Sequence, residues 1–85
     1  MQKPISVEVD LDVEAAYVRY AAGDVAGTLD VWHDGRVAAD LDDAGTVLGI
    51  EVLGLDEAVL SEAHRFALSR DLAFPTHLAA SLVLA

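Results

Sequence analysis

The chain has 85 residues and no cysteine, and its 15 acidic residues outnumber 5 basic ones, giving a formal net charge of −10. This length fits a single domain with a small core. The lack of cysteine excludes disulfides, zinc–thiolate sites and thiol chemistry. The shortage of Lys and Arg argues against DNA or RNA as a partner, because affinity for phosphates comes from basic side chains.

The sequence predicts neither a signal peptide nor a membrane-spanning helix. The start, residues 1–6, lacks the apolar core of a signal peptide. No apolar run approaches the ~20 residues of a membrane-spanning helix. We therefore expect a cytoplasmic protein that does not contact a membrane.

Five segments ahead of Gly54 predict β-strands. Residues 5–10 alternate strictly, with Ile5, Val7 and Val9 on one face, which is typical of a half-buried strand. The other predicted strands cover residues 16–21, 28–32, 36–41 and 47–53. Their connections are too short for parallel crossovers, so we expect an antiparallel meander.

Two turns within this part carry strong hairpin signals. Asp34-Gly35 is typical of a type I′ turn, in which both central residues have positive φ. The segment from Asp42 to Gly45 is an acidic turn closed by a glycine. These turns predict that the last three strands are joined as hairpins.

The chain changes character after Gly54. Asp56 is a suitable N-cap for a helix that we expect to extend to about Arg70 and to end before Pro75. The apolar residues at helical spacing are Val59, Leu60, Ala63, Phe66 and Ala67. This pattern predicts a helix with one face against the sheet.

The final segment, residues 77–85, is apolar on more than one face. Its binding candidates are Leu78, Leu82 and Val83. A terminus this apolar is expected to be buried, either against a second subunit or against its own sheet. Both alternatives stay open, and a homodimer is the favoured oligomer.

These elements together predict an α+β fold in a single domain, residues 1–85. An antiparallel meander of about five strands occupies residues 1–54, and the helical part occupies residues 55–85. One face of the sheet is expected to be covered by the helix.

Two stretches carry a family resemblance. The first is the acidic turn and strand Val9-Asp10-Leu11-Asp12-Val13-Glu14-Ala15-Ala16-Tyr17-Val18-Arg19. The second is the hairpin from Asp40 to Leu53, with Gly45, Gly49, Ile50 and Glu51 in register. Over roughly residues 5–55 the chain resembles the family of small bacterial proteins known as domain of unknown function 2283.

The chain departs from the pattern of that family at four positions: Leu11, Glu14, Ala44 and Thr46. The resemblance implies a small β-meander with a trailing helix. It implies no established activity. Some members are described as antitoxin-type partners of small toxins, so the resemblance also allows a protein-binding role.

The acidic turns are candidate metal sites. Asp40-x-Asp42-x-Ala44-Gly45 resembles the start of a calcium loop, with Glu51 at the twelfth position. However, Ala44 lacks a ligand, and a strand would carry Glu51 far from the turn. The favoured interpretation is a turn whose aspartates cap their own backbone.

A second acidic cluster contains Asp10, Asp12 and Glu14. Alternate carboxylates of this kind could hold a metal ion for hydrolysis, but the histidine nearest in sequence is His33. Solvated turn residues are the favoured interpretation. The metal candidates are therefore Asp10, Asp12, Asp40 and Asp42, as an alternative to the main hypothesis.

Catalytic signatures are missing from the sequence. No two histidines have the i, i+4 spacing of a helical zinc site, and no serine lies in a nucleophile elbow. Glycines are scattered and form no phosphate-binding loop. We therefore expect a protein that is not an enzyme and has no cofactor.

Aromatic residues are the candidates for recognition in the front half. Tyr17 and Tyr20 lie on opposite faces by alternation, and Trp32 shares its face with Thr28 and Asp30 and so borders solvent. The alternative is that Trp32 seals the helix against the sheet. The leading hypothesis is a non-catalytic acidic module that self-associates or binds a basic protein surface.

Overall fold

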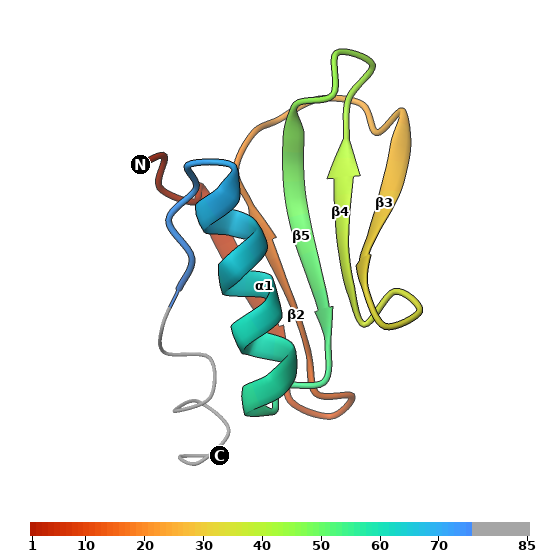
Figure 1. The fold of residues 1–85 in the computed structure, drawn as a ribbon, viewed down its shortest axis with the longest axis vertical. Helices are drawn as coiled ribbons and strands as arrows, with labels where there is room; N and C mark the ends of the chain where they lie inside the picture. The colour runs from red at the N-terminus through yellow and green to blue at the C-terminus, as the bar shows by residue number, and fades with distance from the viewer. Residues whose placement is uncertain (76–85) are drawn as a thin grey trace.

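The computed structural model describes residues 1–75, which form one antiparallel sheet with a helix on one face (Figure 1). The elements are β1 (Ser6–Asp10), β2 (Ala15–Arg19), β3 (Gly27–Trp32), β4 (Val37–Leu41), β5 (Val47–Leu53) and α1 (Glu57–Ser69). The predicted α+β class, with five antiparallel strands and a helix packed on them, is confirmed.

The order of the strands differs from a simple meander at one connection. Across the sheet the order is β1-β2-β5-β4-β3. β1 and β2 form one hairpin, and β3, β4 and β5 form a three-stranded meander. The link from β2 to β3 passes across the end of the sheet, so that β5 pairs with β2 (Figure 1). β1 and β3 are therefore the two edge strands.

Both predicted hairpin turns are present. Asp34 and Gly35 have φ values of 57° and 83°, and the Arg36 amide donates to the His33 carbonyl at 3.3 Å. These values are those of a type I′ turn. In the second turn the Gly45 amide donates to the Asp42 carbonyl at 3.1 Å, and Gly45 has a φ of 83°.

The helix begins and packs as its sequence predicts. The Asp56 carboxylate accepts a hydrogen bond from the Val59 amide at 3.0 Å, which satisfies one of the free amides of the first turn. The buried side of α1 consists of Val59, Ala63 and Ala67. These small side chains allow the helix to lie close to the sheet.

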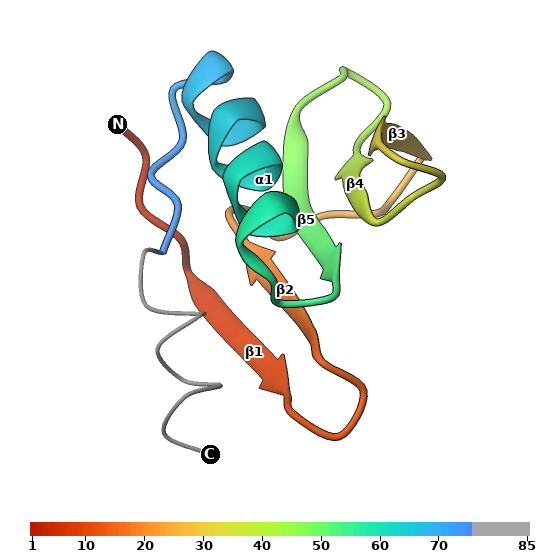
Figure 2. The same ribbon diagram turned by 60° about the horizontal axis from the view of Figure 1, so that its bottom comes forward.

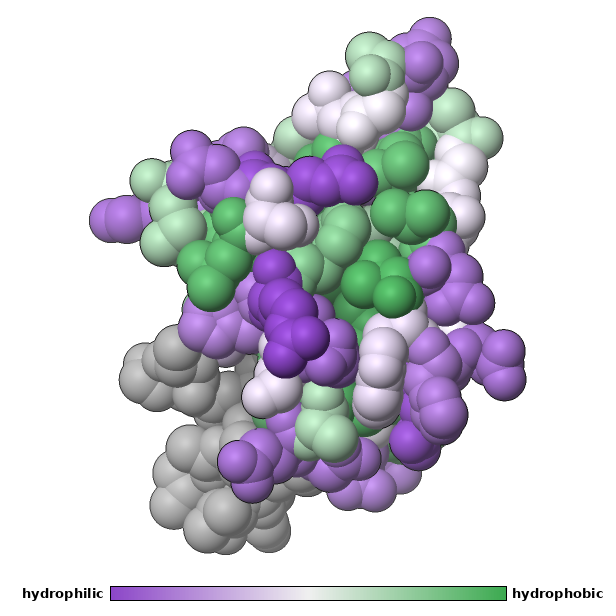
Figure 3. All heavy atoms as spheres, in the orientation of Figure 1, coloured by the Kyte–Doolittle hydropathy of each residue, from purple (hydrophilic) through white to green (hydrophobic). Residues whose placement is uncertain are grey.

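The core lies between α1 and the central strands. Val18 of β2, Val37 of β4, and Ile50 and Val52 of β5 are fully buried there. The helix contacts β5, β4 and β3. Figure 3 shows hydrophobic residues over the strands beside the more hydrophilic surface of α1.

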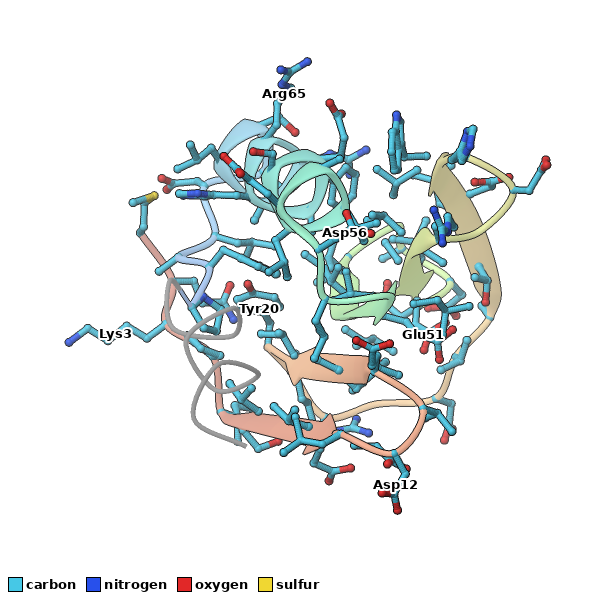
Figure 4. The ribbon with its side chains drawn as sticks, turned by 90° about the horizontal axis from the view of Figure 1, so that it is seen from below. Lys3, Asp12, Tyr20, Glu51, Asp56 and Arg65 are labelled. Atoms are coloured by element: carbon cyan, nitrogen blue, oxygen red, sulfur yellow. The ribbon has the colours of Figure 1, made fainter. Side chains whose placement is uncertain are left out.

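Tyr20 joins the start of the described chain to its end. Its side chain is 2% exposed, and its hydroxyl donates to the Ala73 carbonyl at 2.8 Å. The Gln2 side chain donates to the Tyr20 carbonyl at 2.9 Å, and the Gln2 backbone pairs with Asp71 and Ala73. Figure 4 shows Tyr20 on the side of the sheet that carries α1.

β1 has the predicted alternation but not the predicted burial. Val7 and Val9 lie opposite Val18 and Ala16, so they point to the face that carries the helix. Every residue of β1 is nevertheless exposed. The expectation of a half-buried strand is wrong because α1 packs against β5, β4 and β3, and no helix or strand within residues 1–75 covers β1 (Figure 2).

Among residues 1–75, no helix has the length and apolar character needed to cross a membrane.

Candidate functional site

Tyr17 occupies the open face of the sheet, opposite α1. In the strand register it lies between Glu8 of β1 and Glu51 of β5. Directly paired residues in an antiparallel sheet project to the same face, so the phenol ring has a carboxylate on each side. This row brings two acids and an aromatic ring together on neighbouring strands.

A glycine allows Tyr17 to lie across the neighbouring strand. The Tyr17 hydroxyl donates to one carboxylate oxygen of Asp40 at 2.8 Å, and the other oxygen of Asp40 accepts from the Thr28 hydroxyl at 2.9 Å. A Cβ on Gly49 would collide with the Tyr17 ring and hydroxyl. The tyrosine therefore links β2 to β4 over the bare backbone of β5.

Electrostatics and burial keep the phenol neutral. Burial raises the pKa of Tyr17 to about 12, and the hydrogen bond to Asp40 adds to the rise. The Arg19 guanidinium lies over the ring at 5.3 Å from its centroid and acts in the opposite direction. Burial alone raises the pKa of Tyr20 to about 12.

A groove of about 530 Å³ lies beside this row, at the end of the sheet where β1 turns into β2. Its lining residues are Glu8, Val9, Asp10, Leu11, Asp12, Ala15, Ala16, Tyr17 and Glu51. The groove combines four carboxylates with apolar side chains. Figure 4 shows Asp12 at the tip of the β1–β2 loop.

The edge of the sheet beside the groove carries an apolar strip. We define the β1 apolar strip as Ile5, Val7 and Val9, which are 64%, 40% and 37% exposed. As the outer strand of the sheet, β1 pairs with β2 on one side and presents its other backbone edge outward. None of the elements within residues 1–75 covers this strip.

The acidic turns mainly stabilise their own backbones. Asp42 accepts hydrogen bonds from the amides of Ala44 and Thr46 at 2.9 and 2.8 Å, and Asp10 accepts from the Asp12 amide at 3.0 Å. Asp40 faces Tyr17 instead. In the part of the chain that the structure describes, no group of three or more His, Cys, Asp or Glu residues is placed to hold a metal ion.

Two of the predicted recognition residues belong to the core side of the sheet. Tyr20 is buried, so it is not available to a partner. Trp32 lies opposite Val37, because the strand register shifts between Asp30 and Trp32. This bulge turns Trp32 to the helix side, where it packs against the core, and the alternation that placed it beside Thr28 is wrong.

The remaining candidates have different outcomes. Tyr17 is partly exposed on the open face, as alternation allowed. Leu78, Leu82 and Val83 lie outside the described residues. Two features were not predicted from the sequence: the exposure of the β1 apolar strip, and the close approach of Tyr17 to Gly49. An isolated glycine within a strand pattern was the available signal for the latter.

Searches against protein-family models, curated proteins and solved structures found no match for this chain. The resemblance to domain of unknown function 2283 stays a prediction that rests on its two motifs.

Replacing Gly49 with alanine tests the crossing of Tyr17 over β5. We expect the free energy of unfolding to fall by about 1–3 kcal/mol, because the new methyl group displaces the ring. Urea denaturation followed by tryptophan fluorescence measures this change. In a Tyr17→Ala background the same substitution is expected to cost less, because the obstacle is gone.

Gly27 provides the matched control for that experiment. It lies in β3, and a Cβ there would have nothing within 4 Å. Gly27→Ala is expected to be neutral or slightly stabilising, since alanine has less backbone entropy to lose. If Gly49→Ala is tolerated as well as Gly27→Ala, the proposed crossing is wrong.

The raised pKa values of Tyr17 and Tyr20 predict that the folded chain loses stability at alkaline pH. Each phenol has a pKa of about 12 in the folded chain against 10.0 as its ordinary value, so folding favours the protonated form. Their contribution to the unfolding free energy is complete below about pH 10 and is lost as the pH rises toward about 12. Urea denaturation across this range should show the decline.

A spectrophotometric titration checks the same point directly. Both phenols of the folded chain should ionise near pH 12. The variant Tyr17→Phe should show a smaller decline in stability, because Tyr20 alone remains. Ionisation of both tyrosines at their ordinary pKa, with no decline, would contradict the prediction.

Proposed function

We propose that this chain is a non-catalytic, cytoplasmic protein-interaction module that binds a partner along β1. The observation that carries the proposal is the β1 apolar strip at the edge of the sheet. Exposed edge strands can pair with a strand of another chain. Within residues 1–75 no strand pairs with the outer backbone edge of β1, and the exposed side chains of Val7 and Val9 belong to this strand, with Ile5 directly before it.

Burial of the strip would contribute usefully to binding. Full burial of a valine or isoleucine side chain stabilises by roughly 1.5–3 kcal/mol. Ile5, Val7 and Val9 are already partly covered, so a partner would gain about 1 kcal/mol from each. Backbone hydrogen bonds along β1 would add to this gain and would fix the register.

The alternative, a metal- or small-ligand-binding protein, has less support. The carboxylates of Asp10 and Asp42 accept hydrogen bonds from their own turns. Asp40 is held by Tyr17 and Thr28. A metal ion at these positions would have to compete with contacts that shape the fold.

Two kinds of partner remain within the proposal. One is a second copy of the chain, as the homodimer hypothesis expects, and the other is a basic protein. The resemblance to domain of unknown function 2283 favours a protein partner, because antitoxin-type members act by binding one. The charge of −10 favours a basic partner.

Hydrogen exchange and dye binding test whether the edge is open. In dilute solution the amides of β1 that do not bond to β2 should exchange rapidly. The neutral dye Nile red should bind the wild-type chain. The substitution Val7→Glu should reduce the dye signal several-fold, because it places a charge in the middle of the apolar strip.

Val25→Glu is the control for this experiment. Val25 is also exposed, but it lies in the link between β2 and β3. Its substitution should leave the dye signal unchanged. Protected β1 amides in the dilute monomer, together with no dye binding, would mean that the chain covers its own edge and would overturn the proposal.

A further inference from the structure

We infer that the segment bound along β1 is an extended strand in which apolar and basic residues alternate. The inference rests on the proposed function and names the chemistry of the partner. Two properties of β1 lead to it. Its apolar residues point to the helix side of the sheet, and its acidic residues point to the open side.

An added strand would continue both faces of the sheet. Apolar residues of the added strand opposite Val7 and Val9 would lie on the helix side of the sheet and pack beside the β1 apolar strip. Its residues opposite Glu8 and Asp10 would project to the open side, because directly paired side chains share a face. An antiparallel orientation matches every other pair in the sheet.

The open side of β1 is short of positive charge. Glu8 and Asp10 form no ion pair in residues 1–75, where the recorded pair is Glu62 with Arg65. None of the described residues that line the neighbouring groove is basic, whereas four are acidic. Lysine or arginine opposite Glu8 and Asp10 would therefore be stabilised by several carboxylates at once.

A second copy of the chain would complement the apolar face of β1 but not its acidic face. An antiparallel β1–β1 pair centred on Val7 would join the two apolar strips. It would place Glu8 opposite Ser6 of the other copy, so no acid would gain a basic neighbour. It would also bring together two chains that each carry a net charge of −10. Charge complementarity therefore favours a basic strand.

The register also specifies a polar position. Ser6 lies opposite Arg19 of β2, so a basic residue opposite Ser6 would approach a like charge. A neutral polar residue fits there. Running antiparallel from Asp10 to Ile5, the expected segment reads basic, apolar, basic, apolar, polar, apolar.

Binding of a synthetic peptide tests this pattern. The probe is a peptide with blocked ends and the sequence Lys-Val-Lys-Val-Thr-Ile, and its control carries Glu in place of both Lys residues. Titrations with full-length protein, followed by amide chemical shifts, should show the basic peptide binding at least about tenfold more tightly than the acidic one. The affinity should fall as salt is added, because these charges are exposed.

A charge reversal on β1 provides the matched variant. Glu8→Lys combined with Asp10→Lys should reverse the preference between the two peptides. The control Asp24→Lys with Asp43→Lys changes the net charge equally at exposed loop positions away from β1 and should keep the preference for the basic peptide.

Three results would overturn the inference. Equal binding of the two peptides would show that charge does not select the partner. Binding of neither, with β1 amides still exchanging rapidly, would reject the basic strand and leave the open edge intact. A dimer with protected β1 amides, detected by light scattering and exchange, would assign the edge to a second copy instead.

Discussion

The constraint on which this structure depends is the coverage of a five-stranded sheet by one helix. Strands are spaced about 4.8 Å apart, so five strands span roughly 20 Å across, whereas a helix is about 10 Å wide. α1 has 13 residues and contacts the central strand β5 together with β4 and β3, on the side of the sheet away from β1. The β1 edge is left outside its reach. The exposed strip on β1 therefore follows from the width of the sheet together with the position of α1 toward the β3 side.

The two faces of the sheet are stabilised by different means. On the helix side the central strands are buried beneath α1, and Tyr20 links β2 to the segment after the helix. On the open side Tyr17 passes over Gly49 to reach Asp40, which ties β2 to β4. Because β2 belongs to both arrangements and pairs with β1, the edge strand rests on a well-fixed neighbour. A fixed edge is a suitable template for a partner strand.

Local features of the fold could be predicted from the sequence, and non-local ones could not. The five strands, the type I′ turn at Asp34-Gly35 and the N-cap Asp56 each depend on a few consecutive residues. The pairing of β2 with β5 depends on contacts between distant segments. The bulge before Trp32 shifted the alternation by one residue, which moved this side chain to the other face.

The candidate site shows the same division. Alternation placed Ile5, Val7 and Val9 on one face, but periodicity does not reveal whether anything covers that face. The central claim is that the β1 apolar strip is open. A soluble paramagnetic reagent tests it by broadening the methyl signals of exposed side chains. The account predicts strong broadening for Val7 and Val9 and little for Val18 and Val52, which are fully buried. Equal protection of all four valines would contradict it.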